Sequence, residues 1–188
     1  VHGAGGGYDQ GLLISEIIGG PHRWIAPSRF GYLRSSCPHS DCEPAQQAEV
    51  YRHLLDTLGV DTVAVVAMSA GAQSALEFAR QFPHRCRSLV LLSGASGPVS
   101  PPVNVSGGFP RALLETDPLM WAMIRIGKGY LGRMLGVTAA NTRHAAARER
   151  AALDGFVAAL LPVSLRTEGI LTDIRVLPGF DTGVLAEV

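Results

Sequence analysis

Ser69 has the surroundings expected of a catalytic nucleophile. It is the middle residue of positions 67–71, Ala-Met-Ser-Ala-Gly, which follow an apolar run and precede a run with helical spacing. A sharp turn from strand to helix holds its middle residue exposed and strained, and small residues two places before and after it relieve the crowding. Ala67 stands where the usual G-x-S-x-G pattern has its first glycine, which is a mild departure. The sequence therefore predicts a nucleophilic Ser69, with a structural serine in a tight turn as the alternative.

A glycine-rich loop at positions 2–7, His-Gly-Ala-Gly-Gly-Gly, supplies a second chemical feature. Acyl transfer develops negative charge on a carbonyl oxygen, and two backbone N–H donors held at that point stabilise it. We expect Ala70, the residue after the nucleophile, to supply one donor and Ala4 the other. His2, Gly3 and Gly5 would support the loop. A phosphate-binding loop is the alternative, but positions 2–7 do not spell G-x-G-x-x-G and no G-K-[ST] follows.

The segments around these features predict a parallel α/β sheet. Residues 62–67 and 89–92 are β-branched or apolar runs, as expected for buried parallel strands, and residues 24–26 read as a further strand. Helical spacing is found at residues 12–17, 44–58 and 72–79. Strands that alternate with helices are typical of the α/β class.

The pattern changes after the strand at 89–92. Residues 96–110 are rich in proline, glycine and serine, and from there to about position 174 only helical patterns occur. We therefore expect residues 1–95 to form an α/β core, residues 96–176 a helical lid, and residues 177–188 the start of a return to the core.

The composition limits the classes of partner. Hydrophobic residues make up 47% and charged residues 17%, and the 16 basic residues balance the 16 acidic ones. This balance offers no electrostatic basis for binding nucleic acid or an anionic membrane, and no apolar run is long enough to cross a bilayer. We expect a small neutral or apolar acyl partner, no cofactor and a cytoplasmic location.

The three cysteines are too few and too scattered for a disulfide framework. Cys37, His39 and Cys42 lie close together, but no fourth ligand is spaced to complete a zinc site. We therefore expect ordinary loop residues here, and no bound metal.

The order of the motifs resembles the α/β-hydrolase superfamily, in the branch with HG-x-G-G-type loops and helical lids. The matching blocks are residues 2–6, 26–35, 67–71, 75–79, 82–85 and 89–93. The resemblance covers residues 1 to about 95 well and the lid only loosely. It implies a serine hydrolase that cleaves an ester or a related acyl bond, although the same fold serves cofactor-free haloperoxidase-like and C–C bond-cleaving enzymes.

The resemblance also implies a triad in the order Ser, Asp or Glu, His, with the acid and the histidine after the lid. No carboxylate follows the strand near Leu92, and Asp61 lies at the wrong end of its strand. The other aspartates considered belong to the lid or its exit: Asp117, Asp154, Asp173 and Asp181. The remaining histidines occupy ordinary surface, helix-end or lid positions: His22, His39, His53, His84 and His144.

We therefore expect the catalytic acid and histidine to lie outside this chain, and the strand that ends at Val1 to begin before it. A chain that lacks most of a central strand leaves backbone groups unpaired, so we expect these 188 residues to be unstable alone. The alternative function is a catalytically incompetent fragment, or a non-enzymatic remnant without the triad.

Overall fold

The computed structural model spans the chain and describes every residue except 38–41, 100–107, 128–136 and 138–142. Its first half alternates helices and strands. The elements are α1 (Tyr8–Ile18), α2 (Pro44–Thr57), β1 (Val63–Met68), α3 (Gly71–Gln81) and β2 (Cys86–Leu92).

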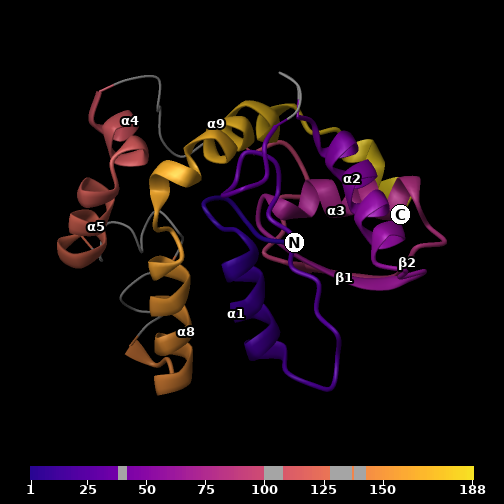
Figure 1. Ribbon diagram of the computed structural model, residues 1–188, viewed down its shortest axis with the longest axis horizontal. Helices are drawn as coiled ribbons and strands as arrows, with labels where there is room; N and C mark the ends of the chain where they lie inside the picture. The colour runs from indigo at the N-terminus through magenta and orange to yellow at the C-terminus, as the bar shows by residue number, and fades with distance from the viewer. Residues whose placement is uncertain (38–41, 100–107, 128–136, 138–142) are drawn as a thin grey trace.

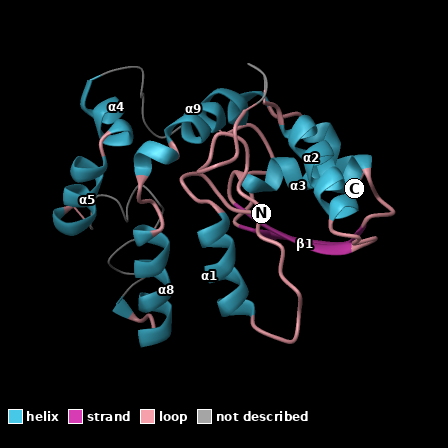
Figure 2. Ribbon diagram, viewed as in Figure 1, coloured by secondary structure: helices cyan, strands magenta, loops and turns pink. Residues whose placement is uncertain are grey.

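The described part of the second half is helical (Figure 2). The elements are α4 (Gly108–Glu115), α5 (Asp117–Ile126), α8 (Ala147–Ala158), α9 (Thr167–Val176) and the short 3-10 turns η1 (Val163–Leu165), η2 (Leu177–Gly179) and η3 (Thr182–Ala186).

Strands β1 and β2 form the parallel pair that the sequence predicted, with α3 as the crossover between them. Val65 lies opposite Leu89, and Ala67 lies opposite Leu91. Two parallel strands require a long crossover because each must return to the same end of the sheet. Both strands therefore finish at one edge, and Ser69 follows β1 at that edge.

Helix α3 is the most deeply buried element. Every residue from Gly71 to Ala79 is buried, and the small side chains of this stretch allow close approach to the sheet. Helices α2 and α3 lie on the same side of the sheet (Figure 1). Tyr51 and Leu55 of α2 pack with Phe78 of α3 in one hydrophobic core that also includes Val65 of β1.

The later helices form a second, smaller core. Leu113, Met120, Ile124 and Val163 are its buried members. Helices α4 and α5 lie far from the sheet, while α8 runs beside α1 (Figure 1). The last turns come back to the sheet, because Phe180 and Val184 pack against Leu76 of α3.

The ends of α1 and α2 agree with those expected from the sequence, whereas α1 begins at Tyr8, before the expected helical segment of residues 12–17. Pro44 opens α2, and Gly59 with φ of 61° follows its end. Gly19 and Gly20, with φ of 69° and 87°, follow α1. Glycine adopts this left-handed backbone region without steric cost, which explains why these helices end there.

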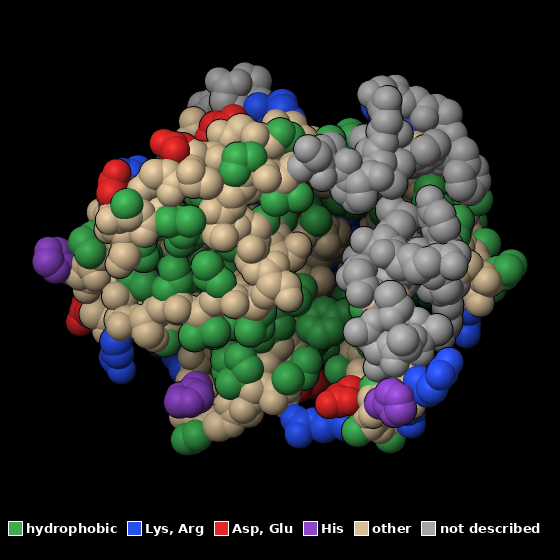
Figure 3. All heavy atoms as spheres, turned by 180° about the vertical axis from the view of Figure 1, so that it is seen from behind, with side chains coloured by type: hydrophobic (Ala, Val, Ile, Leu, Met, Phe, Trp, Pro, Cys, Tyr) green, Lys and Arg blue, Asp and Glu red, His purple; other side chains and the backbone are tan. Residues whose placement is uncertain are grey.

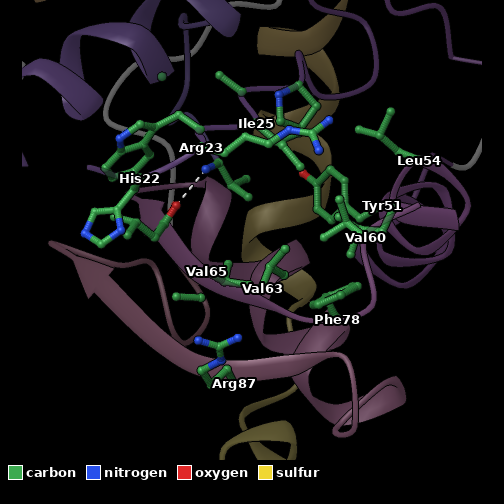
Figure 4. Close-up of a pocket in the computed structure, with 18 of the residues that line it drawn as sticks. His22, Arg23, Ile25, Tyr51, Leu54, Val60, Val63, Val65, Phe78 and Arg87 are labelled. Carbon is green, nitrogen blue, oxygen red and sulfur yellow. Dashed lines mark hydrogen bonds between the residues drawn. The ribbon is translucent and has the colours of Figure 1, made fainter. Parts of the chain in front are cut away.

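The strand predicted at residues 24–26 is wrong. This segment is extended but carries no ladder, and an apolar groove of about 560 Å³ separates it from β1. Ile25 lines one wall of the groove, and Val63 and Val65 line the other (Figure 4). A strand requires a hydrogen-bonded neighbour as well as an apolar pattern, and among the described residues this segment has no such neighbour.

The structure also corrects the prediction for the cysteines. Cys37 and Cys42 form a disulfide with a Cα–Cα distance of 5.9 Å, which lies in the usual range for a bridge. One bridge is not a disulfide framework, but Cys37 and Cys42 are covalently paired and are not the ordinary loop residues that we expected. Cys86 is a free thiol.

The surface is apolar in several places. Seen from behind, hydrophobic side chains are interspersed among few charged ones (Figure 3). Exposed examples include Leu12 and Ile17 on α1 and Val90 on β2. Within the described residues, no helix has both the length and the apolar character needed to cross a bilayer.

Candidate active site

Ser69 occupies the turn between β1 and α3, as predicted, and its backbone is strained. Its φ is 49°, a left-handed value that is uncommon for any residue with a side chain. Three backbone hydrogen bonds hold the turn. The Ser69 N–H donates to the Leu92 carbonyl at 3.1 Å, and the Ser69 carbonyl accepts from Ala72 and Ala95, both at 3.0 Å. Strain of this kind persists only where surrounding contacts enforce it, and it is concentrated at functional sites.

The small residues on either side of Ser69 are required by packing. Ala67 is fully buried in the core below the turn. A Cβ added to Gly71 would collide with the His2 carbonyl oxygen and lie 3.1 Å from the Val1 carbonyl oxygen. The Val1 carbonyl also accepts a hydrogen bond of 3.1 Å from the Met68 N–H. The glycine at position 71 therefore lets the first residues of the chain pack directly against the start of α3.

This packing brings the glycine-rich loop against Ser69. A Cβ on Gly3 would lie 3.1 Å from the Ser69 Cβ and 3.3 Å from the Met68 carbonyl oxygen. Gly5 has φ of 70°, and the Gly6 N–H donates to the Gly3 carbonyl at 3.2 Å, so the loop turns sharply around Ala4. The structure therefore brings together two segments that the sequence separates by more than 60 residues.

Two N–H groups at this junction lack a partner. Neither the Ala4 nor the Ala70 N–H donates a hydrogen bond to any described residue. Ala4 is exposed, whereas Ala70 is buried immediately before α3. Buried backbone donors are almost always satisfied in folded proteins, so the unused N–H of Ala70 is unusual. Together with the open N–H of Ala4 and the strained serine, it fits an anion-binding position.

His2 braces the loop rather than contacting Ser69. The Arg29 N–H donates to the Nε2 of His2 at 2.8 Å, so Nε2 must be unprotonated. The hydrogen is therefore on Nδ1, which donates to the Gly3 carbonyl at 2.8 Å. Burial, followed by the nearby Arg29 guanidinium, holds the pKa of His2 well below its ordinary value. A neutral imidazole with both nitrogens engaged supports the loop geometry.

A buried polar network that sequence reasoning missed surrounds this histidine. Arg29 forms two 2.7 Å hydrogen bonds with the Asp173 carboxylate, and its Nε donates to the His2 carbonyl at 3.0 Å. The Tyr32 hydroxyl donates to Asp173 at 2.6 Å and accepts the Gly5 N–H at 3.3 Å. Burial opposes the charge of Arg29, but the Asp173 carboxylate outweighs it and raises the pKa of Arg29.

Arg166 is a second anchor from the helical part of the chain. It is 1% exposed, and its guanidinium donates to the Gly6 carbonyl and the Asp9 carboxylate. It also donates to the Leu161 carbonyl at 3.1 Å. Arg166 therefore contacts the glycine-rich loop directly, whereas Asp173 reaches the loop only through Arg29 and Tyr32.

The Ser69 hydroxyl, by contrast, has no base within the described residues. No hydrogen bond joins it to any described side chain, and Ser69 is exposed. Four of the histidines considered above lie at exposed positions, and His39 falls outside the described residues: the exposed ones are His22, His53, His84 and His144.

The aspartates of the helical part have other roles. Asp117 accepts hydrogen bonds from the Ser164 N–H at 2.9 Å and the Ser164 hydroxyl at 2.8 Å. Asp181 accepts the Gly183 N–H at 2.8 Å. Within the described part of the chain, no three His, Cys, Asp or Glu side chains gather as a metal site would require. His39 of the cysteine loop again falls outside that part.

The apolar groove beside β1 is separate from this site. Its lining comes mainly from α1, residues 22–27, α2 and β1, and also includes Phe78 of α3 and Arg87 of β2. Figure 4 shows Phe78 and Arg87 beside the β1 residues Val63 and Val65. Ser69, Ala4 and Ala70 are not among its lining residues. A search for the active site by cavity volume alone would therefore miss Ser69, Ala4 and Ala70.

The family described as alpha/beta hydrolase fold matches residues 1–156 of the chain. An uncharacterized protein of Mycobacterium tuberculosis is 33% identical over 122 residues, which cover 61% of this chain and 35% of that protein. The match therefore spans about a third of the length of this curated relative.

Solved structures agree with the family match. An alpha/beta hydrolase fold protein from Nakamurella multipartita has a TM-score of 0.71 at 24% identity, with 100% of this chain and 69% of that chain covered. A thermophilic esterase from Thermogutta terrifontis has a TM-score of 0.63 at 17% identity, with 97% and 64% covered. The strand–Ser69–helix turn, the glycine-rich loop packed against it and these matches lead to one conclusion: the chain belongs to the α/β-hydrolase family.

Proposed function

We propose that the intact protein is a serine hydrolase that cleaves an ester or a related acyl bond through a Ser69 acyl-enzyme. The observation that carries the proposal is the strained Ser69 turn beside two unused backbone donors, Ala4 and Ala70. Strain alone fits many turns, and an unused donor alone fits many loops. Their coincidence at one point fits a site for a tetrahedral intermediate.

In the proposed reaction, the Ser69 oxygen attacks the acyl carbonyl carbon while a general base takes its proton. The carbonyl π electrons move to the oxygen, and the N–H groups of Ala4 and Ala70 stabilise the resulting oxyanion. Collapse of the intermediate expels the alcohol, which receives the proton. Water then attacks the acyl-enzyme carbonyl while the base takes a water proton, and breaking the bond to the Ser69 oxygen releases the acid and returns that proton to Ser69. Each oxyanion donor typically contributes about 10²- to 10³-fold to kcat.

The base and its carboxylate partner are part of the proposal and not of the described site. No described histidine or acid hydrogen-bonds to Ser69, and in the family's order of Ser, Asp or Glu, and His both groups come after the lid. A serine hydroxyl without a base is a poor nucleophile at neutral pH. The competing reading is a chain that cannot run the chemistry.

The substrate class rests on charge and on relatives. The balanced composition, with 16 basic and 16 acidic residues, favours a neutral acyl substrate, and the esterase from Thermogutta terrifontis shares the fold. We further propose that the helices after residue 96 act as a lid that shapes the acyl pocket. Haloperoxidase-like and C–C bond-cleaving reactions use the same fold and remain competing chemistries.

A fluorophosphonate probe tests the proposal on the intact protein. Peptide mapping after labelling is expected to place the phosphonyl group on Ser69, and the folded Ser69→Ala variant is expected to stay unlabelled. A folded wild-type protein that is not labelled at Ser69 would overturn the mechanism. Hydrolysis of a short-chain nitrophenyl ester above background separates the hydrolase from the incompetent fragment.

A further inference from the structure

Helix α9 and the loop of residues 29–35 are joined by backbone hydrogen bonds. The Leu33 N–H donates to the Leu165 carbonyl at 2.6 Å, just before α9, and the Gly169 N–H donates to the Gly31 carbonyl at 2.9 Å. A Cβ on Gly169 would collide with the Tyr32 ring, so glycine permits this close approach. Helix α9 is therefore docked on the loop by its backbone.

Asp173 of α9 concentrates three donors on one buried carboxylate. Two guanidinium nitrogens of Arg29 and the hydroxyl of Tyr32 lie within 2.7 Å of its oxygens. Arg29 and Asp173 are each 7% exposed, and Tyr32 is fully buried. Removing one partner from a buried ion pair leaves an uncompensated charge, which is far more costly than losing a surface pair.

The same two partners of Asp173 reach the glycine-rich loop on both sides of Ala4. Arg29 contacts His2 twice, through its backbone N–H to Nε2 and through Nε to the carbonyl oxygen. Tyr32 accepts the Gly5 N–H with the oxygen whose proton goes to Asp173. Burial, and then the Asp173 charge, raise the pKa of Tyr32 well above its ordinary value, so the phenol keeps that proton.

We propose that Asp173 is a positioning residue for the oxyanion donor at Ala4. Acting through Arg29 and Tyr32, it fixes the residues on either side of Ala4. The rate of the reaction at Ser69 therefore depends on the docking of α9. This inference rests on the proposed function, because it assigns a reaction role to the Ala4 N–H. It makes α9 a fixed support of the reaction site.

Tyr32→Phe is the most selective variant, because it keeps the ring and the Arg29–Asp173 ion pair. It removes the acceptor of the Gly5 N–H and the proton given to Asp173. Displacing an oxyanion donor without deleting it is expected to lower kcat by about 10- to 100-fold. We expect KM for a short-chain nitrophenyl ester to change less than about threefold, because the substrate's ground state needs no oxyanion donor.

Asp173→Asn is expected to lower kcat further than Tyr32→Phe, since it also leaves Arg29 without its counter-charge. Asp117→Asn is the matched control: it removes the charge and one of the two acceptor oxygens of another aspartate in the helical part, which binds Ser164 and does not reach the glycine-rich loop. We expect this control to keep kcat within about twofold.

The experiment measures kcat per active site in the intact protein, with active sites counted by complete fluorophosphonate labelling. Counting active sites corrects kcat for any variant protein that is not folded. If Tyr32 and Asp173 only stabilised the fold, kcat per site would therefore be unchanged. Amide hydrogen exchange of the peptide that covers residues 2–7 gives a readout independent of turnover, and it is expected to accelerate in Tyr32→Phe and not in Asp117→Asn.

The outcomes separate the two proposals. If wild-type protein labels at Ser69 while Tyr32→Phe and Asp173→Asn both keep the wild-type kcat per site and exchange rate at residues 2–7, the positioning role of Asp173 is overturned alone. If folded wild-type protein neither labels nor turns over ester, the proposed function falls and the positioning role falls with it.

Discussion

The glycine-rich loop and the Ser69 turn meet at one site but are held in different ways. The loop is secured by buried side chains from far along the chain, namely Arg29, Tyr32, Asp173 and Arg166. The Ser69 turn is held by backbone hydrogen bonds among β1, β2 and α3, and its hydroxyl has no partner among the described residues. One half of the site thus depends on side-chain pairing, and the other on secondary structure.

The difference follows from the kind of geometry each half requires. A strand followed by a tight turn and a buried helix determines where the Ser69 backbone lies, because α3 cannot move without disturbing the core. The glycine-rich loop has few internal hydrogen bonds, and its glycines lose the most conformational entropy on folding. External side chains must therefore hold it, and four following predictions test this contrast.

The largest effect is expected at Ser69 itself. Ser69→Ala should lower ester turnover in the intact protein by about 10⁴-fold or more, because no other group can form the acyl-enzyme. Stability should change little, since the side chain is exposed. Ser93→Ala is the matched control, because Ser93 is exposed, has the same φ of 49° and follows the end of β2. Equal losses in the two variants would refute the assignment of the nucleophile.

The next largest effect concerns the contact between the two halves. Gly71→Ala should destabilise the protein by about 3 kcal/mol, because the new methyl group collides with the backbone of His2 and Val1, which cannot shift without disturbing the packing around it. Gly179→Ala is the control: no atom lies within 4 Å of its added Cβ, so a change within about 0.5 kcal/mol is expected. Denaturant unfolding measures both, and equal midpoints would contradict the packing described for Gly71.

A smaller effect is expected at the contact between α9 and Tyr32, which supports the glycine-rich loop. Gly169→Ala puts a methyl group against the Tyr32 ring, at a cost partly offset by the better helix propensity of alanine. We expect a net loss of about 1 to 2 kcal/mol of stability. Hydrogen exchange should accelerate at residues 2–7 and not in β1. Uniform acceleration across both regions would show that the loop has no separate support.

The smallest effect is a pH dependence that belongs to the loop alone. Because the pKa of buried His2 is lowered, the unfolded state binds a proton below about pH 6.5 that the folded state does not. Stability is thus complete above pH 6.5 and is lost as the pH falls, by at most about 1.4 kcal/mol per pH unit. The guanidinium groups of Arg29 and Arg166 face His2 and oppose its protonation.

The measurement is the difference in unfolding free energy between wild type and His2→Gln from pH 7.5 to pH 5. Taking the difference removes the titration of groups that do not interact with His2. A difference that does not change with pH would mean that His2 is accessible to protons in the folded state.

Local patterns predicted much of the fold. The two parallel strands, the crossover helix and the turn at Ser69 were all expected from apolar runs and from small residues beside the serine. The strand predicted at residues 24–26 failed because pairing, not pattern, makes a strand. The disulfide between Cys37 and Cys42 was not expected, since so sparse a set of cysteines argued against bridges.

By itself, the sequence determined the strand pair, the crossover helix and the turn at Ser69, because these depend on neighbours within a few residues. Tertiary structure decided how the glycine-rich loop is held. Asp173 lies 144 residues from Arg29, and nothing in its surroundings distinguished it from the other aspartates of the helical part. The pairing of buried charges depends on which segments the fold brings together, and short-range sequence patterns do not predict those long-range contacts.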